Sequence, residues 1–417
     1  MKILAVTYGG GHVALIAPVA KELMRRGHDV TVLGLTTAGS YLKGQGISSI
    51  GFKDLLEPSN REAYEIGCRL AQDLDNGGPV SKEETIAYLG LCYQDLVVRM
   101  GEKVAASKYA QKGRQAFLPI GVMELVMGRF KPDVVFATNS PRAEQAAILV
   151  AGKYGIPSVC AVDLFALQEV QWIGKPGYAS KVCVLNEAVR HMLLAYGRKE
   201  GEIIVTGNPA FDRLQQDEIR AAGVRLSHER GWNDGLVTLL WASQVEPERH
   251  PFAPLRGDPT LPRKIEAVLR HFVQGIQGFR LVVRYHPSEK IEFVEQYGVT
   301  FSPTAESLHA LLHAVDGVVV TASTVGLEAS IIGKPVVSVD CSIFTADAPY
   351  SKMGISHGVP TLDELPGAIL RLHKQGQFAK FPSDDTDGKA LNVVVNTSAT
   401  QKVVNVIESL LKHYEDC

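Results

Sequence analysis

Residues 2–27 carry the pattern that decides the fold, and they read KILAVTYGGGHVALIAPVAKELMRRG. A mostly apolar run comes first, Gly9 to Gly11 then permit a tight turn, and an amphipathic segment follows as far as Gly27. A short run that is apolar on both faces is typical of a strand buried in a parallel sheet. The order of strand, glycine turn and helix therefore predicts an α/β fold with helices on both faces of a parallel sheet.

The same alternation of short apolar runs and amphipathic segments continues along most of the chain. It forms two series, which predict two doubly wound sheets. We expect the first sheet to contain strands at Lys2–Thr7, Asp29–Leu33, Asp133–Ala137, Ser158–Val162, Lys181–Leu185 and Ile203–Thr206. We expect the second sheet to contain strands at Leu236–Trp241, Phe279–Tyr285, Gly317–Thr321 and Pro335–Val339.

The two series also predict the domain organisation. Residues 1–211 are expected to form the first domain, with a charged helical insertion at about 54–127 that lacks a convincing strand. Residues 212–234 are rich in Arg, Glu and Gln, and we expect a linker there, before a second domain at 235–395. Residues 396–417 place apolar side chains on one helical stripe, which predicts a helix that returns to the first domain.

The composition excludes several classes of protein. With 46% hydrophobic residues among 417, the chain can fill a core and is not intrinsically disordered. The 43 Lys and Arg against 45 Asp and Glu leave a net charge of −2, so we expect no nucleic-acid partner. Six scattered cysteines without a CxxC pair indicate neither a zinc site nor a disulfide framework, and we expect no metal.

The hydropathy pattern bears on membranes. No apolar run reaches the length that spans a bilayer, and the first residues do not resemble a signal peptide, so we expect a cytoplasmic protein. The basic segment from Leu96 to Ala116 has two interpretations: a solvated helix face, which we favour, or a contact with an anionic membrane or acceptor. The second interpretation would imply peripheral contact with the inner face of the membrane.

The glycine loop after the first strand is the first candidate site. Gly10 and Gly11 let a ligand approach the backbone amides, the next helix adds a partial positive charge, and His12 stands in the turn. A dinucleotide site would need an acidic residue where the second strand closes on Gly34, so we do not expect nicotinamide chemistry. Asp163 follows another predicted strand, and we expect His12 or Asp163 to take a proton from an acceptor hydroxyl.

The second candidate site lies in the segment Val318 to Ser330, which runs from a buried strand through a hydroxyl-rich turn into a helix. There Ser323 and Thr324 can cap the helix and donate hydrogen bonds to a phosphate. Glu328 lies about one turn further on, where a carboxylate can accept two hydrogen bonds from a ribose diol.

Two residues upstream are expected to join that second site. Arg284 and His286 lie at the end of a predicted strand, and side-chain alternation puts both on one side of it. Ligands of open α/β sheets bind beyond the carboxyl ends of the strands, so we expect both side chains to face the same phosphate.

Taken together, these parts resemble glycosyltransferases of the GT-B fold, in which two Rossmann-like domains face each other across a cleft. The loop from Gly9 to His12 is similar to the glycine-rich loop of the peptidoglycan N-acetylglucosaminyltransferase family and to the Gly-His stretch of the UDP-dependent glycosyltransferases. Ser323 to Pro335 resembles the donor-nucleotide helix of the former family, whose Glu, here Glu328, holds the ribose. The resemblance implies a nucleotide-sugar donor, a glycan or glycolipid acceptor in bacterial surface polysaccharide assembly, and no obligatory cofactor.

Other resemblances keep alternatives open. The His286–Pro287 pair followed by a Ser-Thr turn is similar to bacterial transferases that use CMP-linked sugars, so the donor is UDP- or CMP-linked. Gly207 to Pro209 resembles a segment of the non-hydrolysing UDP-N-acetylglucosamine 2-epimerases, although their Arg-Pro-Glu signature near the first strand is absent here. A noncatalytic nucleotide-sugar-binding protein is the third possibility, after a glycosyltransferase and an epimerase.

Overall fold

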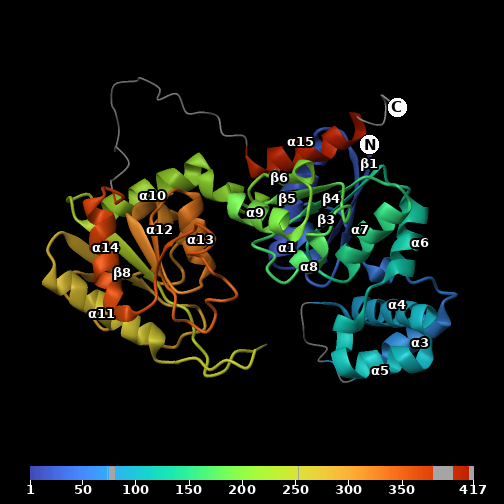
Figure 1. Cartoon of the computed structure of the whole chain (residues 1–417), viewed down its shortest axis with the longest axis horizontal. Helices are drawn as coiled ribbons and strands as arrows, with labels where there is room; N and C mark the ends of the chain where they lie inside the picture. Colours follow the sequence, from blue (N-terminus) through green and yellow to red (C-terminus); the bar gives the residue numbers. More distant parts are fainter. Residues whose placement is uncertain (73, 75–79, 252, 379–397, 413–417) are drawn as a thin grey trace. The chain divides into compact units, whose positions relative to one another are not determined.

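The computed structural model describes residues 1–72, 74, 80–251, 253–378 and 398–412. Backbone contacts divide the chain into two units, Met1–Asp212 with Val395–Cys417 (unit 1) and Arg213–Val394 (unit 2). Within the described residues each unit contains one parallel sheet of six strands, with helices packed on it (Figure 1). The predicted α/β class and the two series of strands are therefore confirmed.

The sheet of unit 1 has the strand order β2-β1-β3-β4-β5-β6, with all neighbours parallel. The strands are β1 (Lys2–Thr7), β2 (Asp29–Gly34), β3 (Val134–Thr138), β4 (Ser158–Ala161), β5 (Lys181–Val184) and β6 (Ile203–Val205). The chain first moves from β1 to β2 on one side and then to β3 on the other. This reversal between β1 and β3 is the topological switch point, where open α/β sheets bind their ligands.

Two helices from opposite ends of the chain cover one face of this sheet. Helix α1 (Gly11–Arg25) and helix α15 (Ala399–Lys412) pack against each other and share a buried cluster with β1 to β5 (Figure 1). Val403, Ile407 and Leu410 of α15 lie in that cluster, so the apolar stripe of this helix is buried in unit 1. Helix α7 (Ala143–Lys153) follows β3 and contacts β1, β3 and β4.

The region predicted as a helical insertion contains helices and no strand among its described residues. Its helices are α3 (Arg61–Leu70), α4 (Lys82–Met100), α5 (Glu102–Lys112) and α6 (Ile120–Phe130), together with the short 3-10 turns η1 (Phe52–Asp54) and η2 (Gly113–Ala116). Helices α3 and α4 approach closely because Gly67 and Gly90 lie at their crossing, where a Cβ atom would meet backbone carbonyl groups. The remaining helices of unit 1 are α2 (Ala38–Gly44), α8 (Val170–Ile173), α9 (Glu187–Tyr196), η3 (Glu200–Glu202) and η4, which begins in unit 1 (Pro209–Gln215).

The sheet of unit 2 has the strand order β12-β11-β10-β7-β8-β9, again parallel throughout. The strands are β7 (Val237–Ala242), β8 (Phe279–Arg284), β9 (Val299–Phe301), β10 (Gly317–Val320), β11 (Val336–Val339) and β12 (His357–Val359). The switch point here lies between β7 and β10. The sequence did not predict β9 and β12. The edge strand β6 is equally short but wholly apolar, whereas β9 contains Thr300 and β12 contains His357 and Gly358, so neither forms an apolar run.

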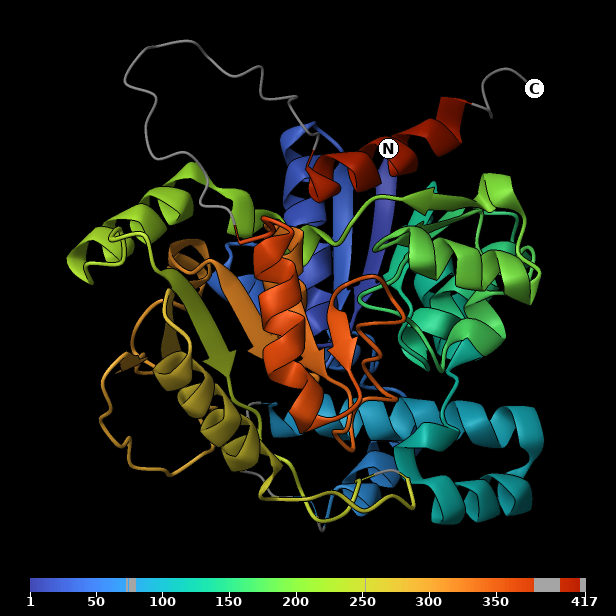
Figure 2. The ribbon, with the colours of Figure 1, turned by 60° about the vertical axis from the view of Figure 1, so that its left-hand side comes forward.

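Helices α11 (Leu261–Gly275) and α14 (Leu365–Lys374) lie side by side on one face of this sheet, and their apolar side chains complete the core around Trp241 (Figure 2). The other helices of unit 2 are α10 (Asp217–Glu229), α12 (Leu308–Ala314), α13 (Thr324–Ile331) and η5 (Leu362–Glu364). None of the helices in the described part of the chain combines the length and apolar composition that a bilayer crossing requires.

The interpretation of residues 212–234 as a linker is wrong. Most of this segment is helix α10, which packs on α12 within unit 2. The two helices approach closely at Gly223, where a Cβ atom would lie 2.3 Å from Cβ of His313. The buried face of α10 contains small residues and few apolar ones. The charged composition of this segment therefore gave no indication of a packed helix. The predicted boundary between the second domain and the last helix, at 395–396, falls outside the described residues.

Candidate functional site

His12 lies at the switch point of unit 1, in the first turn of α1 and beside the end of β3. Its Nδ1 atom lies 2.9 Å from Oγ1 of Thr138, the last residue of β3, and that hydroxyl donates a hydrogen bond of 2.9 Å to Oε1 of Glu144. A hydroxyl has one proton to donate, so when Glu144 is ionised Thr138 accepts from His12, and Nδ1 carries a proton. The neutral ring then has its free lone pair on Nε2, and no hydrogen bond to Nε2 is present among the described residues.

Glu144 fixes the position of the Thr138 hydroxyl, which contacts His12. It lies in the first turn of α7, is fully buried, and also accepts a hydrogen bond of 2.9 Å at Oε1 from the backbone N–H of Tyr8. Burial raises the pKa of Glu144 above its ordinary value, while nearby His12 acts in the opposite direction. The chain Glu144–Thr138–His12 therefore fixes the orientation and tautomer of the imidazole.

Two further carboxylates lie near His12. Asp163 Oδ2 is 3.8 Å from Nδ1 of His12, and Asp163 is held by a hydrogen bond of 3.0 Å from its backbone N–H to Oδ1 of Asn139. Glu169 is partly buried, which raises its pKa, and the charge of Asp163 raises it further while His12 lowers it. His12, Asp163 and Glu169 are therefore electrostatically coupled at one edge of the sheet.

The backbone at this edge is strained. Among the described residues, four non-glycines have a positive φ, and three of them follow strands at this edge: Thr36 at 54°, Arg142 at 73° and Ala166 at 51°. Such conformations cost free energy and cluster at functional sites. Gly10, predicted as a ligand contact, also has a positive φ, of 70°, and precedes α1. A Cβ atom on Gly11 would lie 3.9 Å from Oδ2 of Asp163, so Gly11 faces the same group of residues.

The switch point of unit 2 carries hydroxyl groups rather than a histidine. Thr321, directly after β10, donates a hydrogen bond of 3.2 Å to Oε1 of Gln244, which follows β7. Ser323 is the N-cap of α13, and its hydroxyl accepts weakly from the N–H of Val325 at 3.4 Å. Tyr350 donates a hydrogen bond of 2.9 Å to the carbonyl oxygen of Ser323 and so fixes this turn. Thr324 is the first residue of α13, so the helix N-terminus lies where the sequence predicted a phosphate contact.

Glu328 lies one turn into α13 and is mostly buried. Its Oε2 atom has no hydrogen-bond partner among the described residues, and Nε2 of His309, whose pKa is lowered by burial, lies 3.7 Å away. Burial raises the pKa of Glu328 to about 7. A buried carboxylate with an unused acceptor is costly unless a ligand supplies a donor, so the geometry favours a ligand hydroxyl at this point.

The two residues predicted beside this site have different surroundings. The guanidinium of Arg284 donates hydrogen bonds to Oγ of Ser302 and to the carbonyl oxygens of Pro303, Thr304 and Glu306, at 2.8 to 3.3 Å. Arg284 therefore anchors the segment after β9, and its phosphate contact shared with His286 stays a prediction. His286 is exposed, and its Nδ1 accepts a hydrogen bond from the N–H of Ser288 at 3.1 Å.

Sequence reasoning identified His12 and Asp163 but missed Thr138, Glu144 and Glu169. Thr138 lies in the polar stretch that follows a predicted strand, which was the available signal. Glu144 and Glu169 belong to a first helical turn and a loop, where acidic residues are common. The described residues contain no group of three or more His, Cys, Asp or Glu that could hold a metal ion.

Among solved structures, the chain is similar to UDP-GlcNAc 2-epimerase from Neisseria meningitidis bound to UDP-GlcNAc, with 14% identity, a TM-score of 0.55, and 99% of this chain and 100% of that chain covered. It is similar to MurG from Acinetobacter baumannii, with 14% identity, a TM-score of 0.54, and coverage of 98% and 99%. It is also similar to the glycotransferase of kitacinnamycin, with 13% identity, a TM-score of 0.51, and coverage of 98% of both chains.

The chain has a two-domain fold of the GT-B type. The match extends over nearly the whole length of each of these proteins, so the likeness is one of complete architecture. No protein-family model and no curated protein matches the sequence. At such low identity the GT-B-type fold is what the likeness establishes.

Proposed function

We propose that this protein is an enzyme that acts on a nucleotide-sugar. The observation that carries the proposal is the chain Glu144–Thr138–His12, which leaves Nε2 of His12 as a proton acceptor, with Asp163 3.8 Å from the other ring nitrogen. An oriented imidazole with carboxylates next to it is suited to general acid–base catalysis near neutral pH. Unit 1 then supplies the proton-transfer groups.

Unit 2 binds the nucleotide in this proposal. The N-terminus of α13 offers backbone N–H groups and the hydroxyls of Ser323 and Thr324 to a phosphate, and Glu328 accepts hydrogen bonds from the ribose hydroxyls. His286 is exposed after β8 and adds a ring N–H for the phosphate. These donors stabilise the negative charge that develops on a departing nucleotide.

The first candidate reaction is 2-epimerisation of a UDP-N-acetylhexosamine. An epimerase needs an acid and a base around one sugar ring, and His12, Asp163 and Glu169 supply three titratable groups together. Several of the similar structures are described as UDP-GlcNAc 2-epimerases, from Neisseria meningitidis and Methanocaldococcus jannaschii among others. This support makes epimerisation a stronger candidate than the transfer that the sequence alone favours.

The second candidate reaction is transfer of the sugar to an acceptor. His12 would remove the proton of an acceptor hydroxyl through Nε2, and the Gly10–Gly11 turn would hold the acceptor close to the backbone amides. MurG and the kitacinnamycin enzyme, both similar in structure, support this reaction. A glycan or glycolipid of a bacterial surface polysaccharide would be the acceptor, and a glycolipid would bring the enzyme to a membrane surface.

One experiment separates these candidates. The pure protein is incubated in D₂O with UDP-N-acetylglucosamine and no acceptor, and the sugar is followed by proton NMR. A new 2-epimer that carries deuterium at C2 supports epimerisation. Unchanged substrate, together with turnover once an acceptor is added, supports transfer, and CMP-linked sugars are tested in the same way. Binding of these compounds without any turnover would contradict the proposed enzyme and favour a nucleotide-sugar-binding protein.

A further inference from the structure

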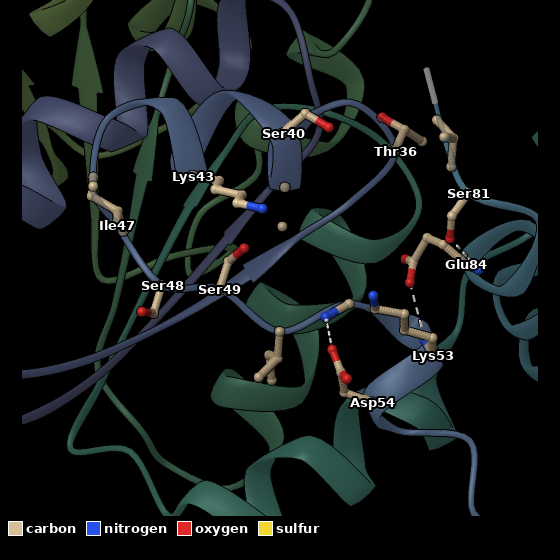
Figure 3. A pocket seen from close by; sticks show the side chains of 16 residues that line it. Thr36, Ser40, Lys43, Ile47, Ser48, Ser49, Lys53, Asp54, Ser81 and Glu84 are labelled. Carbon is tan, nitrogen blue, oxygen red and sulfur yellow. Dashed lines mark hydrogen bonds between the residues drawn. The ribbon is translucent and has the colours of Figure 1, made fainter. Parts of the chain in front are cut away.

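Unit 1 contains a pocket that neither candidate reaction uses. Its volume is about 600 Å³, and it lies where β2 ends, between α2, the segment that follows α2, η1 and the start of α4 (Figure 3). A volume of this size is typical of sites for small molecules. The pocket is built wholly from residues of unit 1, so its geometry depends on one packed unit.

Two lysines are the cationic groups in the lining of this pocket, which also contains Asp54 and Glu84. Lys43 comes from α2 and Lys53 from η1, and neither Nζ atom makes a hydrogen bond or ion pair within the described residues. Figure 3 shows Lys43 reaching toward Ser49. A lysine ammonium is strongly hydrated and has three donors, which makes it a common partner of phosphate and carboxylate groups.

The carboxylates in the lining are already engaged. Asp54 accepts a hydrogen bond of 2.7 Å from the backbone N–H of Gly51. Glu84 accepts from the backbone N–H groups of Phe52 and Lys53 at 2.9 and 3.0 Å, one on each oxygen. These backbone donors offset much of the negative charge and hold η1 in place. The ammonium groups of Lys43 and Lys53 are therefore the charged groups of the lining that make no hydrogen bond within the described residues, although the charge of Lys53 also acts on nearby Glu84.

Hydroxyl groups surround the two lysines. Thr36, Ser40, Ser48 and Ser49 line the pocket, and none of their hydroxyls bonds to another group in the described part of the chain. The segment with Ser48 and Ser49 is held as an extension of the sheet, because Gly34 N–H donates to Ile50 O and Ile50 N–H donates to Val32 O, both at 2.9 Å. The hydroxyls of Ser48 and Ser49 are thus held in fixed positions, which lowers the entropy cost of binding a sugar.

The pocket lies next to the loop that carries His12. Gly9 has no room for a side chain, because a Cβ atom would lie 1.8 Å from Oγ1 of Thr37, the neighbour of the lining residue Thr36. Thr36 itself has a φ of 54°, a costly conformation that places its side chain at the pocket. A ligand in the pocket would touch the same turn that packs against the catalytic loop.

We propose that this pocket binds an anionic sugar, whose phosphate or carboxylate group contacts Lys43 and Lys53 and whose hydroxyls contact the surrounding Thr and Ser side chains. The inference rests on the pocket alone and holds whichever reaction the enzyme performs. The ligand is a sugar monophosphate or a sugar acid, since both chemistries suit two ammonium groups with neutral donors around them.

Calorimetric titration tests this inference with glucose 6-phosphate, glucuronate, inorganic phosphate and neutral glucose as probes. At least one of the two anionic sugars should bind, more tightly than inorganic phosphate and than glucose, and added salt should weaken that binding. Lys43→Met and Lys53→Met should each weaken it about tenfold or more, the effect of losing a hydrogen bond between charged groups. Comparison of the affinities for glucose 6-phosphate and glucuronate shows whether the site prefers a phosphate or a carboxylate group.

Lys108→Met is the matched control, because Lys108 is an exposed lysine of α5 in the same unit and does not line the pocket. It should leave the affinity unchanged. The inference is overturned if neither anionic sugar binds, if inorganic phosphate binds as tightly as glucose 6-phosphate, or if the Lys43 and Lys53 variants match the control. Binding of UDP, followed in the same variants, should stay constant, which separates this inference from the proposed function.

Discussion

The carboxyl-terminal edges of the two sheets share a topological position but differ in chemistry. At the edge of unit 1, His12, Asp163 and Glu169 gather above the buried Glu144. At the edge of unit 2, hydroxyls and a helix N-terminus surround one buried carboxylate, Glu328. The same sheet edge thus carries an imidazole with carboxylates in unit 1, and in unit 2 a helix N-terminus with hydroxyls and one buried carboxylate. This difference is the basis for proposing proton transfer in unit 1 and nucleotide binding in unit 2.

Removal of the imidazole should have the largest effect on this comparison. His12→Ala should lower kcat by about 10²- to 10⁴-fold, the range that one general base contributes. KM for the nucleotide-sugar should change little, because unit 2 supplies the nucleotide contacts. Steady-state kinetics with the substrate identified by NMR measures both constants. If kcat of His12→Ala were normal, the proposed proton transfer by unit 1 would be contradicted.

Substitution of Glu328 should show that ionisation of this carboxyl group lowers the unfolding free energy of unit 2. Its pKa in the folded protein is about 7, above the ordinary value of 4.5, so ionisation favours the unfolded state. The unfolding free energy should therefore fall as pH rises from 4.5 to 7, by about 3 kcal/mol at most, and then level off. Glu328→Gln cannot ionise and should lose the part of the decline that Glu328 contributes, while Glu144 and Glu169, whose pKa values are also raised, keep theirs.

Urea denaturation at pH 4.5 and pH 7.5 measures that difference. Glu229→Gln, an exposed substitution on α10, is the control and should keep the decline of the unaltered protein. If the unfolding free energy of Glu328→Gln declined as much as that of the control, Glu328 would not be a buried carboxylate with an unused acceptor. The contrast between the two sheet edges would then be weaker.

A matched pair of threonines sharpens the comparison further. Thr138→Val breaks the link between His12 and Glu144, and we expect kcat to fall about tenfold, since one buried hydrogen bond beside charged groups is lost. Thr321→Val removes the corresponding hydroxyl in unit 2, which bonds to Gln244, and kcat should change less than about twofold. Thr138→Ser should restore the activity. Equal losses in Thr138→Val and Thr321→Val would argue for a general packing defect.

The smallest effect on binding is expected for Arg284. Because its guanidinium is bonded to Ser302 and three carbonyl groups, Arg284→Met should destabilise unit 2 by about 1–3 kcal/mol. UDP affinity should change by less than about threefold, which is well under 1 kcal/mol. Thermal unfolding and calorimetric titration measure the two quantities. A large loss of UDP affinity with unchanged stability would instead support the phosphate contact that the sequence predicted.

The sequence predicted the buried strands well, because a central parallel strand such as β1 or β10 is apolar on both faces and this pattern is local. It failed at β12, where His357 and Gly358 are exposed, and at α10, whose buried side contains the small residue Gly223. In both cases the element is defined by what it packs against, and that information is not local.

The same distinction explains the sites. Gly10, Gly11 and His12, and likewise Ser323 to Glu328, are adjacent in sequence, so a motif identifies them. Thr138 and His12 are 126 residues apart and meet only because β3 pairs with β1. The hydrogen bonds of Arg284 could not be predicted from the sequence, because alternation gives the side of a strand but not the acceptors present there, which come from the segment after β9.

The central claim is that unit 2 binds the nucleotide while unit 1 performs the proton transfer. Calorimetric titration of UDP into the unaltered protein, His12→Ala and Glu328→Gln tests it most directly. The account predicts that UDP affinity is the same in the first two proteins and about tenfold or more weaker in Glu328→Gln, which has lost a charged acceptor for the ribose. Unchanged affinity in Glu328→Gln, or a loss confined to His12→Ala, would contradict it.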